Sequence, residues 1–458
     1  MGVFKLFKKN NGEKKNSHYL SGKEIKAIAR ENAKIMRRLE KEKYRKKPES
    51  EYVTEMQDDN NILEVENLHS YFFTDQGVVK AVNGATFNIP LNSTVGVVGE
   101  SGCGKSVTSM SIMRLLQGPT GQIVEGSIRF KAYDFKRDEK GDYIPVYERD
   151  ENGEIVYEQK LDKKGKPVLD KAGNPVMIPK QKTDEHGLGI FEKEEKVFDI
   201  AKMPIDEMYR LRGRQMSMVF QEPMTSLNPV FTIGDQLDEV TLLHVPGATK
   251  ELAKKRSIEM LNMVGIAMPE RVYASFPHEL SGGMRQRVMI AMALAGEPRL
   301  IIADEPTTAL DVTIQAQILD LFNDLKHRIN GSILLITHDL GVIAEMADYV
   351  IVMYAGRIIE QGTASEIFHN PCHPYTQGLQ KSKPTMKSST DKLFNIPGNV
   401  PNPVNMPNYC YFKERCSKCV EKCSGDYPCM VQVSPTHFVA CHLYEEENPV
   451  EVKTDGEV

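Results

Sequence analysis

The chain lacks any long uninterrupted hydrophobic run. Hydrophobic residues make up 40% of its 458 residues and charged residues 26%, and no apolar stretch approaches the roughly 20 residues that a helix needs to cross a bilayer. If the protein acts at a membrane, other chains must therefore span it.

The N-terminal residues also lack targeting signals. No apolar core is followed by a small-residue cleavage site, as a secretory leader requires. N-myristoylation of Gly2 would require Ser or Thr at position six, where this chain has Leu6. We therefore expect a cytoplasmic protein.

The charge of the chain is unevenly distributed. The formal net charge is -5, yet residues 1–50 carry 16 Lys plus Arg against 6 Glu. We interpret residues 1–60 as a basic extension, solvated and partly helical or disordered, with 34–47 able to lie on an anionic membrane or touch nucleic acid. Ordered structure is expected from Ile62, and residues 447–458 form an acidic tail.

The hydrophobic pattern from residue 61 onward predicts an α/β fold. Strands are predicted at 62–73 and 78–90 around a turn at Gly77, and at 94–98. Residues 213–295 are predicted to be mostly helical, with 3.6-residue spacing in 253–264 and 284–294. Strands at 300–303 and 332–336, separated by a helix over 314–327, predict a parallel sheet.

An inserted segment over residues 131–186 repeats the turn signal Asp-x-x-Gly. The repeats begin at Asp138, Asp150, Asp162 and Asp170, and each precedes a short β-prone patch. This pattern predicts serial hairpins, although the charge content leaves disorder open. It assigns no function.

A glycine-rich loop follows the strand predicted at 94–98 and precedes a helix predicted at 107–116. Its sequence, Gly-Glu-Ser-Gly-Cys-Gly-Lys-Ser over 99–106, matches the phosphate-binding pattern G-x-x-x-x-G-K-[ST] in the context that the pattern requires. Backbone N–H groups can surround the phosphates, Lys105 can reach the outer phosphates, and Ser106 can ligate Mg²⁺. The predicted ATP-binding residues here are Gly99, Glu100, Ser101, Gly102, Cys103, Gly104, Lys105, Ser106 and Val107. Cys103 is interpreted as a small filler.

Carboxylates and an imidazole follow two apolar strands. Asp304 and Glu305 come after 300–303, and His338 follows 332–336. We expect Asp304 to hold hydrated Mg²⁺ and Glu305 to polarise the attacking water, because γ-phosphate hydrolysis needs an oriented nucleophile. His338 can donate to the γ-phosphate or to its water.

The stretch Leu-Ser-Gly-Gly-Met-Arg-Gln-Arg over 280–287 resembles the signature of ATP-binding-cassette (ABC) proteins. The resemblance implies an ABC nucleotide-binding domain over 61–390, with a parallel-sheet core, an antiparallel β-subdomain and a helical subdomain at 213–295. It also implies that two such subunits enclose two ATP molecules. Ser281, Gly282 and Gly283 would then contact the ATP bound by the opposite subunit, as an anion site at a helix start.

Three further elements of the family fall in order. Gln221 resembles the loop glutamine that contacts Mg²⁺ and water and faces the membrane partner. Residues 309–311 (Ala-Leu-Asp) resemble the loop that communicates across the dimer, which makes Asp311 a contact in trans. Phe72 occupies the place of the aromatic that stacks on adenine, and its neighbours Tyr71 and Phe73 are alternatives.

The segments 221–229 and 283–293 resemble the first of the two ATPase subunits of dipeptide and oligopeptide importers, whose second subunit usually has Gln at the place of Met284. The resemblance implies a sister ATPase subunit, two transmembrane permeases, an external peptide-binding protein and a place on the cytoplasmic face of the membrane. No nucleic-acid partner is expected. Importers of nickel or glutathione are the first alternative, and a soluble ABC ATPase of DNA repair or translation is the second. A regulatory binder without turnover is disfavoured because Lys105, Glu305 and His338 are all present.

Six of the eight cysteines lie between 410 and 441. This density is not expected to form disulfides in a cytoplasmic chain, so a metal centre is the natural interpretation. The spacing of four of them, with the preceding His437, is similar to the iron–sulfur motif of the importer subgroup, in a small Cys-rich domain at 391–446. The proposed ligands of a [4Fe–4S] cluster are Cys410, Cys416, Cys423 and Cys441. Cys419 and Cys429 depart from that pattern, and the spacing of Cys416 and Cys419 leaves Zn²⁺ open, as well as free thiols.

Overall fold

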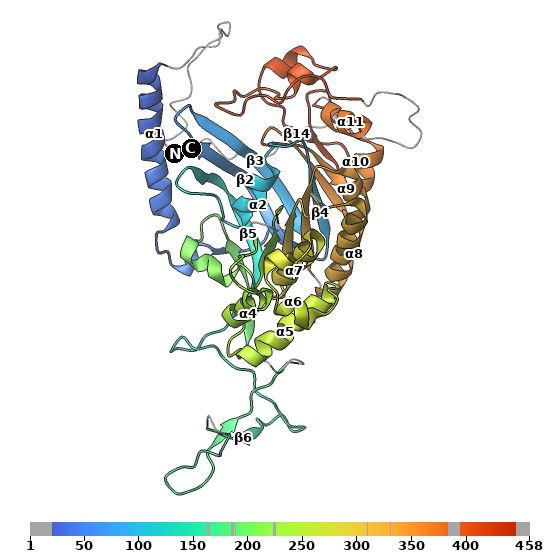
Figure 1. The fold of residues 1–458 in the computed structure, drawn as a ribbon. Coiled ribbons are helices and arrows are strands. Elements are labelled where there is room, and N and C mark those ends of the chain that lie inside the picture. The colour runs from blue at the N-terminus through green and yellow to red at the C-terminus, as the bar shows by residue number, and fades with distance from the viewer. Residues whose placement is uncertain are drawn as a thin grey trace.

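The computed structural model describes residues 21–445, apart from 163–164, 185–186, 188, 223–225, 309, 330 and 383–393. The predicted acidic tail at 447–458 lies outside the described residues. Figure 1 shows two sheets at the centre of the molecule, with helices α4 to α7 on one side and a narrow arm around β6 projecting beyond them.

The larger sheet has eight strands in the order β14-β15-β13-β12-β4-β11-β10-β9. The strands are β4 (Thr94–Val98), β9 (Met216–Val219), β10 (Leu300–Asp304), β11 (Ser332–Thr337), β12 (Tyr349–Tyr354), β13 (Arg357–Thr363), β14 (Met430–Gln432) and β15 (Phe438–Ala440). Strands β9 to β12 and β4 run parallel, so the prediction that 300–303 and 332–336 pair in parallel is confirmed. Strands β4, β9, β10 and β11 are buried at every residue, which explains why they read as continuous apolar runs.

The smaller sheet is antiparallel, with the order β1-β8-β5-β2-β3. Its strands are β1 (Val53–Thr54), β2 (Asn61–Phe73), β3 (Val78–Pro90), β5 (Gly121–Phe135) and β8 (Lys193–Asp199). The predicted hairpin of 62–73 and 78–90 is therefore present, with Phe73 paired to Val78. A further two-stranded ladder joins β6 (Tyr157–Gln159) and β7 (Met177–Pro179).

The remaining α-helices pack on the sheets or, in the case of α4 to α6, mainly against one another and α7. They are α2 (Lys105–Ile112), α4 (Ile233–His244), α5 (Lys250–Met263), α6 (Pro269–Tyr273), α7 (Gly282–Leu294), α8 (Val312–Ile329), α9 (Leu340–Met346), α10 (Ala364–His369) and α11 (Pro374–Lys381). Short 3-10 helices lie at Glu49–Glu51, Ile205–Arg210, Pro277–Glu279, Lys413–Arg415 and Glu421–Ser424.

The helical assignment of residues 213–295 missed strand β9. Met216–Val219 pairs in parallel with β10 and completes the edge of the larger sheet. A four-residue segment that is apolar except for Ser217 is too short for its period to separate strand from helix, so the sequence alone could not distinguish them.

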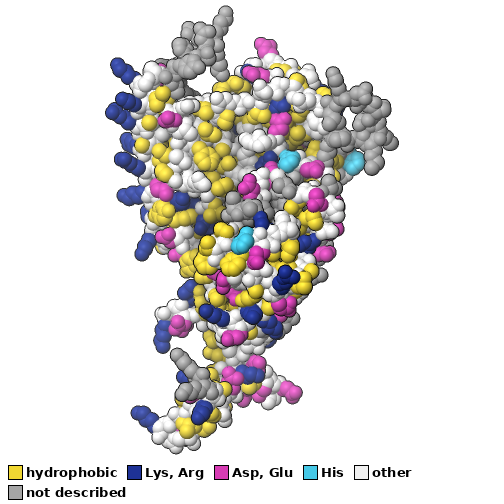
Figure 2. Space-filling view, viewed as in Figure 1, with side chains coloured by type: hydrophobic (Ala, Val, Ile, Leu, Met, Phe, Trp, Pro, Cys, Tyr) yellow, Lys and Arg dark blue, Asp and Glu magenta, His cyan; other side chains and the backbone are white. Residues whose placement is uncertain are grey.

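The expectation that order begins at Ile62 was wrong. Helix α1 (Gly22–Lys43) starts at Ser21, whose side chain forms a capping box with Glu24. Its buried Asn32 donates from Nδ2 to Thr74 O at 2.6 Å. The exposed basic residues of this helix are Lys23, Lys26, Arg30, Lys34, Arg37, Arg38 and Lys41. Figure 2 shows Lys and Arg side chains as a dark blue row along the edge of the molecule where Figure 1 places α1. The helix therefore packs on the antiparallel sheet through its polar and apolar inner face.

The predicted serial hairpins are present, with shifted boundaries. Residues 131–135 belong to β5 and pair with 193–197 of β8, so the inserted arm spans 136–192. Isolated bridges such as 147 with 181 and 149 with 155 form the arm together with β6 and β7. In each predicted turn the aspartate begins the turn, as when Asp150 Oδ1 accepts the N–H groups of Asn152 and Glu154 at 2.9 Å. A fifth turn, at Asp184 to Gly187, was not predicted.

Candidate active site

The phosphate-binding loop connects the carboxyl end of β4 to the start of α2 in the middle of the larger sheet. Gly104 is the N-cap of α2 and has φ of 105°, a conformation that favours glycine. A Cβ there would lie 2.3 Å from Ala81 O. Glycine is therefore required for both the turn and the close approach of the hairpin β2–β3.

Lys105 lies across this loop. Its Nζ donates to Gly99 O at 2.8 Å and to Glu100 O at 3.2 Å, and the residue is buried. Cys103 is also buried, and burial raises the pKa of its thiol, which fits the predicted filler role. Glu100, Ser101 and Gly102 are exposed or half-buried at the outer side of the loop, and Val107 is half-buried in the first turn of α2.

Asp304 lies at the end of β10 and reaches the first turns of α2. Its carboxylate accepts from Ser106 Oγ at 3.0 Å and from Ser109 Oγ at 3.2 Å. Burial raises the pKa of Asp304, although these two hydrogen bonds act against the shift. A carboxylate next to a hydroxyl at a phosphate-binding loop is an oxygen donor set that fits Mg²⁺.

Glu305 gathers three neighbours around one carboxylate oxygen. Oε2 accepts from Gln221 Nε2 at 3.0 Å and from Thr308 Oγ1 at 2.9 Å, and lies 3.4 Å from His338 Nδ1. Glu305 has φ of 48°, held by its N–H bond to Ile336 O at 2.8 Å. The three predicted catalytic residues therefore meet at one point beside the phosphate-binding loop.

Burial distinguishes Phe72 from its aromatic neighbours Tyr71 and Phe73. Tyr71 and Phe73 are buried at 7% and 5% exposure, whereas Phe72 is only half-buried. Tyr71 Oη donates a hydrogen bond to Asn83 Oδ1 at 2.8 Å. The Phe72 ring lies against Gly121 of β5, where a Cβ would be 2.8 Å from the ring. Phe72 is thus the aromatic of the three that remains accessible to a base.

The signature residues lie at the start of α7. Ser281 is its N-cap and accepts from Met284 N at 3.3 Å. Ser281 and Gly282 are exposed, and no atom lies within 4 Å of the place where a Gly282 Cβ would stand. Asp311 accepts from Ile314 N at 3.0 Å at the start of α8, whereas Ala309 lies outside the described residues.

The four predicted metal ligands gather in the C-terminal region. Cys423 and Cys441 are buried, Cys410 and Cys416 are half-buried, and all are free thiols. Burial raises the pKa of Cys410 to about 12 and that of Cys441 to about 11, and neighbouring thiols of this group add to both shifts. The two cysteines that depart from the pattern, Cys419 and Cys429, are exposed.

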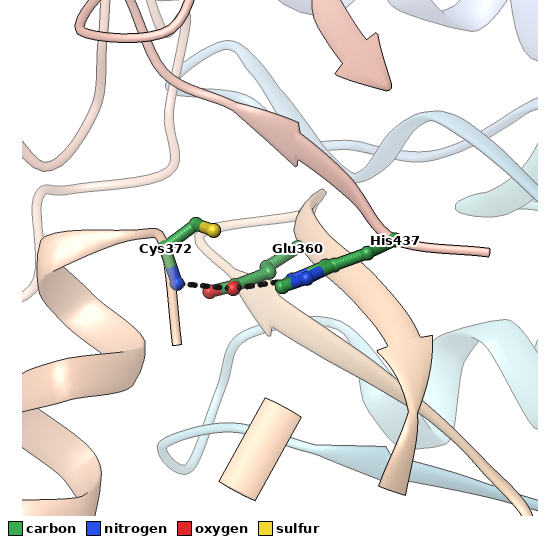
Figure 3. A group of neighbouring side chains, drawn as sticks. All are labelled: Glu360, Cys372 and His437. Atoms are coloured by element: carbon green, nitrogen blue, oxygen red, sulfur yellow. Dashed lines mark hydrogen bonds and ion pairs between the residues drawn. The ribbon is translucent and has the colours of Figure 1, made fainter. Parts of the chain in front are cut away.

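A separate group joins Glu360, Cys372 and His437, whose candidate ligand atoms lie within 4.8 Å of one another (Figure 3). Glu360 is fully buried, and its oxygens accept from Cys372 N at 2.6 Å, His373 N at 2.9 Å and His437 Nε2 at 2.8 Å. The carboxylate is therefore fully engaged by N–H donors. Glu360 and His437 therefore form a buried ion pair. This pair holds the turn that precedes β15 against strand β13.

Four residues at the site were not found from the sequence. Ser109 follows Ser106 by three positions on α2, so the helical period could have indicated it. Thr308, Tyr375 and Arg415 have no such signal. Tyr375 Oη accepts from Glu100 N at 2.8 Å, and Arg415 forms an ion pair with the Glu100 carboxylate at 2.7 Å.

Comparison with known proteins agrees with this geometry. The family described as "ABC transporter" matches residues 82–186 and 188–308, and the one described as "Oligopeptide/dipeptide transporter, C-terminal region" matches 359–423. The Bacillus subtilis oligopeptide transport ATP-binding proteins AppD and OppD are each 43% identical to this chain, over 85% of it and over 98% and 90% of their own lengths. The dipeptide transport ATP-binding protein DppD of the same organism is 40% identical over 84% of this chain and 95% of its own.

Among solved structures, a dimeric ATP-binding cassette, MJ0796, aligns with a TM-score of 0.46 and 22% identity over 66% of this chain and 98% of that chain. In the described part of the chain, no helix is both long and apolar enough to cross a membrane.

Fold, phosphate-binding loop and signature helix define an ABC-type ATPase. The chain belongs to the oligopeptide/dipeptide transporter family of ABC ATP-binding proteins.

Proposed function

We propose that this chain hydrolyses ATP to power the uptake of oligopeptides or dipeptides through partner permeases. The observation that carries the proposal is the convergence of Gln221, Thr308 and His338 on Glu305 beside a phosphate-binding loop. The relatives AppD and OppD are named oligopeptide transport ATP-binding proteins and DppD a dipeptide transport ATP-binding protein, which supports the class of solute.

Each residue of the site has a proposed role. Lys105 and the loop N–H groups hold the phosphates, Phe72 stacks on adenine, and Ser106, Asp304 and Gln221 hold hydrated Mg²⁺. Glu305 orients the attacking water, and His338 donates a hydrogen bond near the γ-phosphate. Mg²⁺, when bound, neutralises charge on the phosphates.

A sister ATPase subunit completes the site. The exposed Ser281 and Gly282 at the N-terminus of α7 present a hydroxyl and backbone N–H groups to an outside anion. We propose that these residues, with Gly283 and Asp311, contact the ATP held by the partner. The assembly also contains two transmembrane permeases and receives peptides from an external binding protein, which places this chain on the cytoplasmic face of the membrane.

The four cysteines are proposed to hold a [4Fe–4S] cluster. Tetrahedral Zn²⁺ brings thiolate sulfurs to within about 4 Å of each other. Among the described residues, however, the group that meets within 4.8 Å is Glu360, Cys372 and His437, and not these cysteines. A cluster spaces its four thiolates more widely, and its positive metal ions favour deprotonation of buried thiols.

The test is reconstitution of the chain with its co-purifying permeases in proteoliposomes, with the external peptide-binding protein added on the side opposite the ATPase. Peptides on the side opposite the ATPase should stimulate hydrolysis and be taken up with ATP, whereas nickel or glutathione should do neither. Stimulation by nickel or glutathione would replace the peptide proposal. Isolation with nucleic acid or ribosomes instead of permeases would contradict the transport role altogether.

A further inference from the structure

The C-terminal region contacts the candidate ATP site at both of its ends. Arg415 lies against the phosphate-binding loop, and Asn405 lies against the hairpin that carries Phe72. The contacting residues are 315 and 327 positions apart in the chain. One contact is made to Glu100 within the phosphate-binding loop itself, and the other to Val78 on the strand that pairs with that of Phe72.

At the phosphate end, the Arg415 guanidinium forms a bidentate ion pair with Glu100. Nη1 donates to Oε2 at 2.7 Å and Nη2 to Oε1 at 3.0 Å. The Arg415 side chain is only 5% exposed, and its Nε also donates to Pro397 O at 3.0 Å. A planar bidentate pair fixes orientation as well as distance, so Arg415 fixes the Glu100 side chain at the entrance of the loop.

The backbone of Glu100 is held from the same side. Its N–H donates to Tyr375 Oη at 2.8 Å. Tyr375 is fully buried and packs its ring against Tyr354 and Phe412, with centroids 4.7 and 5.5 Å away. Both the side chain and the main chain of Glu100 are therefore held by residues from the C-terminal part of the chain, namely Arg415 and Tyr375.

At the base end, residues 403–405 run along the edge strand β3. Val78 N donates to Asn405 Oδ1 at 3.0 Å, and Asn405 N donates to Val78 O at 2.9 Å. Val404 forms a bridge with Val79, which is the β3 residue paired with Phe72. Gly77 allows this approach, because a Cβ there would lie 2.4 Å from Asn405 Nδ2.

We propose that Tyr375 and the segment 396–415 position the ATP site at both ends, with Arg415 and Tyr375 holding the phosphate-binding loop and Asn405 holding the hairpin of Phe72. These are positioning residues, because they act through Glu100 and Val78. The proposal rests on the proposed roles of the loop and of Phe72. It predicts that substitutions at the two ends weaken binding of the base and binding of the phosphates separately.

The experiment compares the affinities of the full-length chain for MgATP and for magnesium tripolyphosphate, which lacks the base, by isothermal titration calorimetry. Asn405→Ala is expected to weaken ATP roughly three- to tenfold, the net worth of one or two hydrogen bonds, and to leave tripolyphosphate unchanged. Arg415→Lys keeps the charge but loses the bidentate geometry, so it should weaken both ligands by a similar factor. The controls, Asn408→Ala and Glu414→Ala at exposed neighbouring positions, should change neither.

Several outcomes would overturn the proposal. Equal weakening of both ligands by Asn405→Ala, or no effect of Arg415→Lys on either, would do so. If Arg415→Lys lowers the melting temperature too far for titration, Tyr375→Phe takes its place, because it removes only the acceptor of Glu100 N–H, and it must weaken both ligands. Phe72→Ala tests the premise: if it leaves ATP affinity unchanged, the assigned base site is wrong, whatever the positioning variants do.

Discussion

The side-chain amide of Gln221 donates to Glu305 Oε2 at 3.0 Å, across the carboxyl ends of the neighbouring strands β9 and β10. Thr308 donates to the same oxygen at 2.9 Å. Among the described residues, no hydrogen bond is found for the second oxygen, Oε1. Glu305 is thus held through one oxygen, and the other is available to orient water.

Replacing Glu305 with Gln should stop steady-state hydrolysis and leave ATP binding intact. The amide is almost isosteric but cannot polarise water as a carboxylate does, and loss of such a group typically costs about 10² to 10⁴ in rate. Phosphate release by the assembled complex and ATP titration measure the two effects. Glu345→Gln on the exposed side of α9 is the control. Unchanged turnover in E305Q would remove Glu305 from the catalytic role.

Thr308→Val should lower kcat about three- to tenfold, because it deletes one hydrogen bond to Glu305 without changing the volume greatly. The affinity for ATP should stay the same, since Thr308 contacts the catalytic carboxylate of Glu305 and has no proposed role in ATP binding. Thr308→Ser retains the hydroxyl and should restore most of the rate. If the Ser and Val variants are equally slow, the methyl group and its packing matter instead of the donor.

The sequence predicted the core of this site because its residues follow buried strands. Asp304, Glu305 and His338 come directly after apolar runs, and the ends of neighbouring parallel strands meet at one edge of a sheet. Gln221 could be assigned only by resemblance, since the strand before it was taken for part of a helical region. Thr308 and Arg415 were missed, because loop geometry and contacts over 300 residues leave no local pattern.

The accessory parts were harder for a similar reason. Helix α1 was expected to be solvated, because its basic residues dominate the composition. Its docking depends on the inner residue Asn32, whose partner Thr74 O lies 42 positions away in the chain. The arm was predicted better, since each Asp-x-x-Gly turn is a local signal, but its boundaries depend on where β5 and β8 stop pairing.

The proposed metal ligands can be separated from the extra cysteines. Cys410→Ser should abolish bound iron and the broad visible absorbance of a cluster, because a [4Fe–4S] centre uses four thiolates. Cys419→Ser, at an exposed position, should retain both. Anaerobic purification with elemental analysis provides the measurement. Zinc in place of iron, lost from both variants, would favour the Cys416 and Cys419 pair as ligands.

The buried pair of Glu360 and His437 should make stability depend on pH. Burial alone would lower the pKa of His437, but hydrogen bonds with Cys372 and Glu360 raise it to about 9. Because the pKa of His437 is raised in the folded state, its protonation contributes its full stabilisation at pH values below the ordinary pKa of about 6.5. This contribution is lost as the pH rises through about 9. The free energy of unfolding should therefore fall by about 1–3 kcal/mol over that range.

Urea denaturation between pH 6 and pH 10 checks this dependence. His437→Gln should be less stable than the unmodified chain at pH 6 and should lose most of the difference by pH 10. His369→Gln, at an exposed position on α10, should follow the unmodified chain at every pH. A constant difference for H437Q across the range would assign the effect to packing rather than to charge.

Removing the arm should leave the cassette folded and able to bind ATP. The ladder between β5 and β8 ends with Phe135 paired to Lys193, so residues 136–192 can be replaced by Asn-Gly, which closes a two-residue hairpin. The deletion removes Tyr143 and Phe191, whose ring centroids lie 5.0 and 5.8 Å from that of Phe135. Arg214, which stacks over Phe135 at 3.6 Å, remains.

The expected result is therefore a small loss of stability with unchanged ATP affinity, measured by thermal unfolding and titration. A loss of about 1–2 kcal/mol corresponds to the missing aromatic contacts. An insoluble product, or one that no longer binds ATP, would show that the arm is part of the folding unit of the antiparallel sheet. Because β5 lies next to β2, the strand of Phe72, such a failure would reach the base site through β5 rather than through the larger sheet.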